Sequence, residues 1–379
     1  MNELPEKSVH MAVTSPPYWG LRLYLDKDDP NRHLEIGQEE TAEAYIESMR
    51  QIFGGENNPV GVWRVLRDDS VLWVNWGDSY SSTGGRTSAH GPNADCGNTL
   101  SEATPTSRSG PRNMKELKPK NLVGIPWRCA LALQADGWIL RSDIIWHKTS
   151  PMPESVTDRC TKAHEYIFMF AKNEKYFFDN EAIKEPCESD HPSGAGYKRE
   201  HRLTYQNADG TARGNDAEWN NIGGTRNKRD VWTVGPSGFS GAHFACYPPD
   251  LIKPCILSST SAKGCCPKCG SPWERIVETE SVGRRRKDGM PIAPMPGHPE
   301  PDTGAAGSTI TKTVGWEPTC KCGETSLVPC TVIDPFGGSG TTGQVAIELG
   351  RNAILVELNP KYIPLIETRT STTPGLALA

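Results

Sequence analysis

The stretch that decides the fold is Val332-Ile333-Asp334-Pro335-Phe336-Gly337-Gly338-Ser339-Gly340-Thr341-Thr342-Gly343, near the end of the printed chain. Its first residues are apolar and β-branched, so residues 331–334 are predicted to form a buried strand, and 341–349 have helical spacing. The glycines between them allow a tight turn and let a ligand approach the backbone. A further strand at 353–357 and a helix at 362–368 complete a β-α-β-α pattern.

An acidic side chain follows this loop at a spacing that is typical of a nucleotide-binding site. Glu357 ends the predicted second strand, 17 residues after Gly340, where a carboxylate can accept hydrogen bonds from a ribose diol. Residues 338–343 also fit G-x-G-x-x-G, so a nicotinamide oxidoreductase is one alternative, and an ordinary strand–turn–helix is another. Only 22 residues follow Glu357, which argues against a second nucleotide-binding half. No Gly-Lys-Ser/Thr follows the glycines, which excludes a phosphate loop.

Composition excludes several classes of protein. The chain has 379 residues, enough for one large domain with insertions or for two domains. No stretch of 18 apolar residues occurs, so no membrane-spanning helix and no membrane partner are expected. Residues 1–5 have neither a basic end nor an apolar run, so we expect a cytoplasmic protein, in a bacterial or phage-infected cell. A net charge of −5 excludes a uniformly basic surface, so nucleic acid would contact local patches.

The rest of the chain alternates between predicted strands, helices and long polar segments. We expect strands at 9–14, 71–76, 138–146 and 165–170, a short hairpin partner at 175–178, and helices at 41–53, 122–135 and 250–257. Residues 78–120 predict a long loop, 184–229 are polar and partly basic, and 281–313 are rich in proline and glycine.

A second motif, Thr14-Ser15-Pro16-Pro17-Tyr18-Trp19, follows the first predicted strand. Two prolines stiffen the backbone and have no N–H groups, while Ser15 offers a hydroxyl acceptor and Tyr18 and Trp19 offer flat faces. Such a loop suits a planar base with an exocyclic amino group. Two acceptors on its hydrogens would free the nitrogen lone pair and stabilise the charge that develops during methyl transfer. A rigid turn with exposed aromatic residues is the alternative.

Together the two motifs resemble those of the amino-group DNA methyltransferases. Their order, with Thr-Ser-Pro-Pro-Tyr before Asp-Pro-Phe-x-Gly-Ser-Gly-Thr-Thr, is similar to the circularly permuted β group of that family. Residues 121–127, 137–148, 164–170, 243–256 and 351–362 resemble further segments of the same family. The resemblance leaves out roughly 184–230 and 258–328.

This resemblance implies an α/β fold, a Rossmann-like, mostly parallel seven-stranded sheet, with S-adenosylmethionine as cofactor. By motif, the catalytic loop consists of Ser15, Pro16, Pro17 and Tyr18. The cofactor-binding residues would be Asp334, Phe336, Gly338, Ser339, Gly340, Thr341 and Glu357, with the Phe336 ring facing the sulfonium. Family members usually carry a Gly-Asp strand upstream of Leu4-Pro5, and the printed sequence begins after that point.

The first motif also bears on which base is methylated. Within the family, Ser-Pro-Pro-Tyr resembles cytosine-N4 enzymes more often, whereas Asp- or Asn-Pro-Pro-Tyr resembles adenine-N6 enzymes. We therefore expect a site-specific enzyme that methylates cytosine N4 in double-stranded DNA, with adenine N6 as the alternative. A cytosine-C5 mechanism would need a Pro-Cys nucleophile in the catalytic loop, and none is present there.

Cysteine spacing predicts a metal site. Cys266 and Cys269 form a C-x-x-C pair and Cys320 and Cys322 a C-x-C pair, each followed by glycine. Four thiolates in this pattern can complete a tetrahedral structural zinc site in a zinc-ribbon-like insertion. Cys265 and His298 are rival ligands, and unligated cytosolic thiols are the alternative.

DNA contact requires the target base to be flipped out of the duplex. Basic clusters at 115–120, 198–202, 226–229 and 284–287 are candidates for phosphate contacts, although any one of them is more often a solvated surface. Lys148, with Trp146 and His147, follows a predicted strand and is a candidate for the pocket, with a core Trp and a surface polar pair as the alternative.

The resulting organisation has five parts: 1–183, the catalytic half; 184–242, a variable target-recognition region; 243–257, a return to the core; 258–328, the zinc-ribbon-like insertion; and 329–379, the cofactor-binding half. A methyltransferase of RNA or protein amino groups and a non-catalytic zinc-ribbon DNA-binding protein are competing hypotheses. The sequence leaves open a restriction endonuclease partner and a homodimer.

Overall fold

The computed structural model describes residues 1–21, 23–26, 28–81, 117–151, 153–186, 225–235, 247–282 and 308–371. The chain divides into two compact units. The first contains residues 1–179, 229–274 and 318–379, and the second contains 180–228 and 275–317. In the described part of the chain, no helix combines the length and the apolar character needed to cross a membrane.

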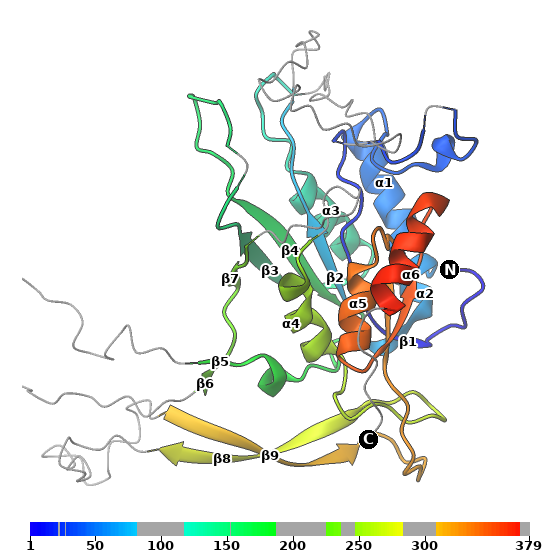
Figure 1. The fold of residues 1–379 in the computed structure, drawn as a ribbon, viewed down its shortest axis with the longest axis vertical. Coiled ribbons are helices and arrows are strands. Elements are labelled where there is room, and N and C mark those ends of the chain that lie inside the picture. The colour runs from blue at the N-terminus through cyan, green and yellow to red at the C-terminus, as the bar shows by residue number, and fades with distance from the viewer. Residues whose placement is uncertain are drawn as a thin grey trace, which may run out of the picture. The chain divides into compact units, whose positions relative to one another are not determined.

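A seven-stranded sheet forms the centre of the first unit, in the order β11-β10-β1-β2-β4-β3-β7 (Figure 1). Its neighbouring strands are parallel except at β4, which is antiparallel to both β2 and β3. The prediction of a mostly parallel sheet is therefore confirmed. The strands are β1 (Val9–Thr14), β2 (Leu66–Trp76), β3 (Ile139–His147), β4 (His164–Ala171), β7 (Val231–Thr233), β10 (Thr331–Asp334) and β11 (Asn352–Leu355).

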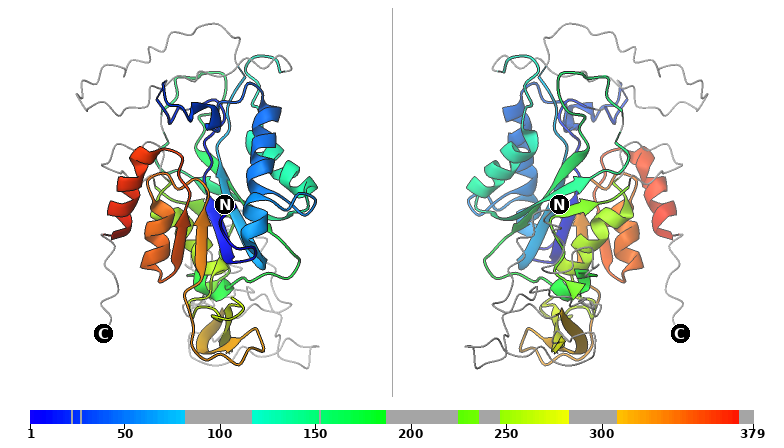
Figure 2. Two further views of the ribbon diagram at one scale, coloured as in Figure 1. Left: turned by 90° about the vertical axis from the view of Figure 1, so that its right-hand side faces the viewer. Right: turned by 90° about the vertical axis from the view of Figure 1, so that its left-hand side faces the viewer.

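Helices cover both faces of this sheet, as Figure 2 shows from two sides. One face carries α1 (Ala42–Phe53), α2 (Gly61–Val65) and α3 (Ile125–Ala135); the other carries α4 (Pro249–Ser259), α5 (Thr341–Glu348) and α6 (Ile363–Ser371). Short 3₁₀ turns occur at Arg32–Leu34 and Pro360–Tyr362.

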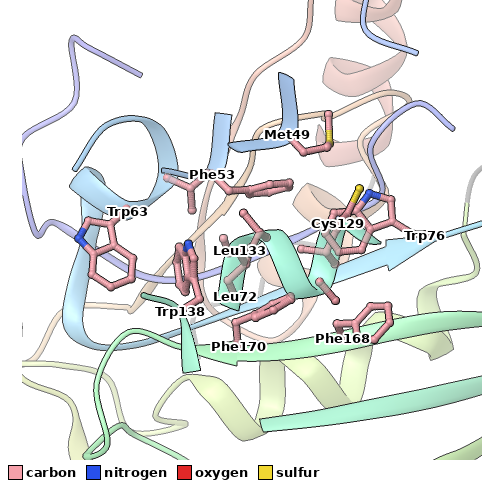
Figure 3. Close-up of a cluster of buried hydrophobic side chains, with 14 of the residues drawn as sticks. Met49, Phe53, Trp63, Leu72, Trp76, Cys129, Leu133, Trp138, Phe168 and Phe170 are labelled. Atoms are coloured by element: carbon pink, nitrogen blue, oxygen red, sulfur yellow. The ribbon is translucent and has the colours of Figure 1, made fainter. Parts of the chain in front are cut away.

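Strand side chains alternate between the two cores. Leu72 and Phe168 point into the cluster beneath α1 and α3, which Figure 3 shows, whereas Trp73 and Met169 point into the cluster beneath α4 and α5. This two-residue period is the ordinary geometry of a strand. It accounts for the apolar runs at 71–74 in β2 and 167–171 in β4, which are buried on both faces.

Local signals set the ends of the helices. The Thr41 hydroxyl accepts from Ala44 N at 3.1 Å, and Gly54, at φ +66°, ends α1, as its sequence predicts. Helix α3 begins at Ile125, three residues later than predicted, because the Asp78 carboxylate accepts from the backbone N–H groups of Gly124 and Ile125, each at 3.0 Å. Because Asp78 lies 46 residues before Gly124, the sequence near the helix gives no sign of this cap.

Several predictions about single elements were wrong. Residues 175–178 do not form a strand: Phe177 is buried and its N–H donates to Asp69 O at 2.9 Å, so the segment packs as irregular chain. Strand β2 starts five residues before the predicted 71, and β11 ends at Leu355, so Glu357 lies two residues beyond the strand. Helix α2 and strand β7 were not predicted.

The second unit contains the paired strands β5 (Glu185–Pro186) and β6 (Thr225–Arg226), and most of β8 (Trp273–Val282) and β9 (Ser308–Pro318). The Arg275 guanidinium lies 4.5 Å from the Trp316 ring centroid and donates to Thr313 Oγ1 at 2.8 Å, which fixes this end of the β8–β9 ribbon.

Two leucines on α3 test which face of the helix carries the core. Leu133 is fully buried, whereas Leu131 is 53% exposed. We expect Leu133→Ala to lower the free energy of unfolding by about 2–5 kcal/mol, through lost burial and the cavity left behind. The matched Leu131→Ala change should stay within about 0.5 kcal/mol. Urea unfolding of both variants measures the difference, and equal losses would contradict this assignment of the face.

Candidate functional site

The site is organised around the buried carboxylate of Asp334, at the end of β10. Its Oδ1 accepts from Thr14 Oγ1 at 2.5 Å and from Phe336 N at 3.0 Å. Its Oδ2 accepts from Thr342 Oγ1 at 2.5 Å and from Tyr247 Oη at 3.0 Å. Burial raises the pKa of Asp334, and the donors oppose that rise. One carboxylate thus joins β1, the glycine loop, α5 and the chain before α4.

Sheet geometry explains why the two sequence motifs meet. Strands β1 and β10 are parallel neighbours, with Met11 opposite Val332 and Ala12 opposite Ile333. Parallel strands end at the same edge of a sheet, so the loops after Thr14 and Asp334 leave side by side. This edge is where open α/β sheets usually hold their ligands.

Both loops line one cavity of about 260 Å³. Ser15 and Pro17 contribute from the first motif, and Phe336, Gly338 and Ser339 from the second. The remaining lining residues are Tyr24, Leu25, Glu35, Ile36, Tyr247, Asp334, Pro335, Gly337, Thr341, Val356, Glu357, Leu358, Asn359 and Tyr362. A single ligand can therefore contact residues that are more than 300 positions apart in the chain.

The glycine loop is shaped to admit such a ligand. Gly338 and Gly340 have φ of +51° and +85°, a region that strongly favours glycine. A Cβ on Gly340 would lie 3.1 Å from Ile366 Cα, so this residue also lets α6 pack closely. Gly338 N donates to Glu357 Oε2 at 2.8 Å, which fixes the loop against the acidic side chain that the sequence singled out.

Glu357 is held rigidly in the cavity wall. Its Oε1 accepts from Asn359 N at 2.8 Å, in addition to the Gly338 contact at Oε2. Burial raises the pKa of Glu357, and these backbone donors oppose that rise. Each oxygen keeps a lone pair for a further donor, such as a ligand hydroxyl.

The first motif rests on a polar network. Ser15 Oγ donates to Asn75 Oδ1 at 3.3 Å. Tyr18 Oη donates its single hydrogen to Glu165 Oε2 at 2.6 Å and lies 2.8 Å from Asn75 Oδ1. Asn75 Nδ2 donates to Glu165 Oε2 at 3.3 Å, and Lys148 Nζ pairs with Glu165 Oε1. Burial and the Glu165 charge raise the pKa of Tyr18 well above its ordinary value, so its hydroxyl stays protonated.

The prolines and aromatic residues of this motif differ in exposure. Tyr45 Oη donates to Pro17 O at 2.9 Å, and Pro16 is buried. The Tyr18 ring packs on Gly77, where a Cβ would lie 2.4 Å from Tyr18 Cε2. The prediction that Trp19 offers a free face for stacking was wrong. Trp19 is 2% exposed, and its indole N–H donates to Glu39 O at 3.0 Å.

One of the three carboxyl groups in the cavity wall was not predicted. Glu35 is 7% exposed, one oxygen accepts from Tyr24 N, and its Oε2 has no hydrogen-bond partner among the described residues. Burial raises the pKa of Glu35. Asn359 Nδ2 donates to Tyr24 O at 2.8 Å, which places this acid on the Glu357 side of the cavity.

Most of the predicted active-site residues line the cavity, and these are Ser15, Pro17, Asp334, Phe336, Gly338, Ser339, Thr341 and Glu357. The two loops also contain Pro16, Tyr18 and Gly340, which do not line it. Cys266, Cys269, Cys320 and Cys322 come together in a separate cluster. Sequence reasoning missed Asn75, Glu165, Tyr247 and Glu35, because each depends on strand pairing or loop folding. Tyr247 had a weak signal, since it lies in the 243–256 segment.

The other predicted contacts are only partly described. The clusters at 198–202 and 284–287, His298, and residues 243–246 lie outside the described residues. In the described clusters, Arg226 pairs with Glu185 at 2.9 Å and Lys120 with Asp158 at 2.5 Å.

A family model and the sequences of related proteins indicate one family. The N6/N4 methylase family model, described as DNA methylase, matches residues 9–266 and 329–368. Type II methyltransferase M.XycI of Xanthomonas campestris pv. cyanopsidis is 35% identical over 369 residues, 97% of this chain and 83% of that protein. M.SmaI of Serratia marcescens is 32% identical over 94% of this chain and 82% of its own. The solved PvuII DNA methyltransferase (cytosine-N4-specific) aligns with a TM-score of 0.47 and 15% identity, covering 97% of this chain and 81% of its own.

The raised pKa of Glu35 predicts a stability that depends on pH. A carboxyl group whose pKa is higher in the folded than in the unfolded protein is held in its protonated form by folding. The free energy of unfolding therefore falls as the pH rises from 4.5, the ordinary pKa, through the raised pKa of the folded state. Glu35→Gln keeps the acceptor for Tyr24 N and removes the charge. We expect this variant to be more stable than the parent at pH 8, with the difference shrinking as pH falls through that window.

Thermal unfolding between pH 4 and pH 8 measures this effect, and Glu40→Gln, an exposed neighbour, is the control. A Glu35→Gln variant that is less stable at pH 8, or whose difference does not vary with pH, would contradict the assignment.

Proposed function

The chain belongs to the N6/N4 DNA methylase family, and from this premise we propose that it methylates the N4 amino group of cytosine at a specific site in DNA. The coarser activity follows from the family: the protein is an S-adenosylmethionine-dependent DNA amino-methyltransferase. One observation supports this use of the cavity above all others. Ser15, from the motif that would face the base, shares a cavity with the glycine loop and Glu357.

The cavity residues fit the proposed cofactor. S-adenosylmethionine supplies a methyl group activated by a sulfonium, together with a ribose diol and cationic groups. Glu357 has lone pairs for the diol. Glu35 Oε2, which has no hydrogen-bond partner among the described residues, supplies further acceptor capacity in a wall that contains three carboxyl groups. Phe336 presents the aromatic side chain that we propose faces the sulfonium, where a ring is a suitable partner for a cation. Asp334 holds the loop in shape through its own hydrogen bonds to Thr14 and Thr342.

Ser15 is proposed to bind the amino group of the base. Its hydroxyl hydrogen is directed to Asn75 Oδ1, so the oxygen lone pairs remain to accept from an N–H of the base. We propose the Pro16 carbonyl as the second acceptor of the loop, because the Pro17 carbonyl already accepts from Tyr45. Two acceptors draw the amino hydrogens out of the ring plane, so the nitrogen lone pair becomes available. The same oxygens stabilise the positive charge that develops on nitrogen as its bond to the methyl carbon forms and the carbon–sulfur bond breaks.

Tyr18 and Glu165 are proposed to hold this loop in its reactive shape. Tyr18 donates to Glu165 and packs on Gly77, so its ring cannot swing freely. Lys148 balances part of the Glu165 charge. Because hydrogen bonds position the loop before the base arrives, little reorganisation is needed at the reaction step.

The choice of cytosine rests on the first motif. A neutral Ser stands where a carboxylate or amide is more usual in adenine-N6 enzymes, according to the resemblance. We therefore assign cytosine N4 as the target, and adenine N6 is the outcome that would overturn the base while leaving the family in place.

The proposal extends to the organisation of the chain. Residues 1–183 and 329–379 would supply the catalytic and cofactor-binding halves in permuted order, with 243–257 returning to the core. Residues 184–242 would recognise the target sequence, and 258–328 would form a zinc-ribbon-like insertion. The type II designation of the relatives supports a role beside a restriction endonuclease that cuts the same site.

Product analysis tests the base directly. Double-stranded DNA incubated with the purified chain and S-adenosylmethionine should, after digestion to nucleosides, contain N4-methyldeoxycytidine by mass spectrometry. N6-methyldeoxyadenosine instead would refute the cytosine assignment. RNA offered in parallel should remain unmodified.

Two substitutions separate the roles of the two motifs. Ser15→Ala should lower kcat by about 10²–10³-fold, because a contact that strengthens in the transition state is lost, while the cofactor Kd is unchanged. Glu357→Ala should raise the cofactor Kd by about 10- to 100-fold, because hydrogen bonds to a charged group are removed. Calorimetry and single-turnover kinetics measure the two quantities.

Ser48→Ala, a change at a half-buried position on α1, is the control for both variants. The division of roles fails if Ser15→Ala weakens cofactor binding as much as Glu357→Ala does.

A further inference from the structure

Four cysteines outside the active site lie at metal-binding separation. Cys266, Cys269, Cys320 and Cys322 each place a sulfur atom within 4.8 Å of the other three. None of the four is in a disulfide. Tetrahedral zinc with Zn–S bonds of about 2.3 Å holds its sulfurs roughly 3.8 Å apart, so small side-chain adjustments close the site. The family model skips residues 267–328, so it does not account for this cluster.

The backbone around each cysteine pair has the tight turn that a metal site needs. Gly270 and Gly323, directly after the two pairs, both have φ of +72°. Gly270 N donates to Cys266 O at 2.8 Å, which closes the first turn. The Ser271 hydroxyl lies 3.3 Å from Cys269 Sγ, where it can donate to a thiolate. The sulfur atoms of the two turns therefore lie together and can share one metal ion.

The first turn is fixed to the catalytic sheet. Arg67, in β2, donates to Cys269 O at 2.6 Å and pairs with both oxygens of Asp69. His10, in β1, contacts Gly270 O through Nε2 at 2.8 Å. This turn is therefore held in place before any ion binds, so the ligands are partly preorganised.

A neighbouring cluster of His10, Cys265 and Cys330 is not a second metal site. Thr331 N donates to His10 Nδ1 at 3.0 Å, so Nε2 carries the hydrogen and donates to Gly270 O. Neither ring nitrogen retains a lone pair for a metal. Cys265 directs its thiol to Val328 O at 3.4 Å, so this rival ligand belongs to the buried cluster and not to the four-sulfur set.

We propose that Cys266, Cys269, Cys320 and Cys322 bind one structural Zn²⁺ ion as thiolates. The first unit contains all four ligands: the chain leaves it after Glu274, five residues beyond Cys269, and returns at Pro318, two residues before Cys320. The ion thus joins the two ends of a long excursion, and because it binds only the folded chain, its binding free energy adds to the free energy of folding. All four coordination positions are filled by protein, so the ion has no open position for catalysis.

Metal content tests the proposal independently of methylation. The full chain, purified without chelator, should contain one zinc ion per chain when its metal content is measured by inductively coupled plasma mass spectrometry. Cys269→Ser and Cys322→Ser should each lower zinc content at least five-fold, whereas Cys160→Ser, an exposed thiol elsewhere in the described chain, should leave it unchanged. Cys269→His, which restores a zinc ligand, should recover more metal than Cys269→Ser.

A second measurement covers the case in which a serine variant fails to fold. Parent protein stripped of metal and titrated with Co²⁺ should develop the visible and near-ultraviolet bands of tetrahedral cobalt thiolate, saturating at one equivalent and bleached by Zn²⁺. A parent protein without zinc that shows no such bands overturns the proposal, as does iron in place of zinc. Undiminished zinc in the folded serine variants also overturns it.

Discussion

A single buried carboxylate holds the active site together. Asp334 accepts four hydrogen bonds from three stretches of chain: β1, the segment before α4, and the glycine loop with the start of α5. The three side-chain donors, Thr14, Tyr247 and Thr342, are themselves buried. A charged acceptor in such surroundings is stable only while its donors remain in place, so the site forms as a unit. The same carboxylate therefore positions the glycine loop, the end of β1 and the start of α5. The cavity forms where these segments meet.

Sequence reasoning predicted the parts of the fold whose cause is local. The bounds of β1, α1 and α5 were close, because apolar periodicity, a Thr cap and glycine stops act within a few residues. Strand β7 and helix α2 were missed because each is short and depends on neighbours for burial. The displaced start of α3 has the same origin, since its cap, Asp78, comes from a distant loop.

The candidate site shows the same limit. The two motifs were visible as motifs, but their support was not: Asn75 and Glu165 approach Ser15 and Tyr18 only because β2 and β4 pair in antiparallel register. Glu35 is an ordinary acidic residue in the sequence and becomes notable only through its burial and its Oε2, which has no hydrogen-bond partner among the described residues. The function was thus predictable from the residues of two loops. The residues that orient those loops could be identified only in the folded structure.

The central place of β1 has a consequence for synthesis of the protein. All six of its residues are buried, and it is flanked by β2 on one side and β10 on the other. A ribosome makes β2 soon after β1, but β10 comes more than 300 residues later than β1. During that interval one edge of an apolar strand has no partner, which is a template for aggregation. Chaperone protection of the nascent chain is therefore most valuable until residues 331–334 emerge.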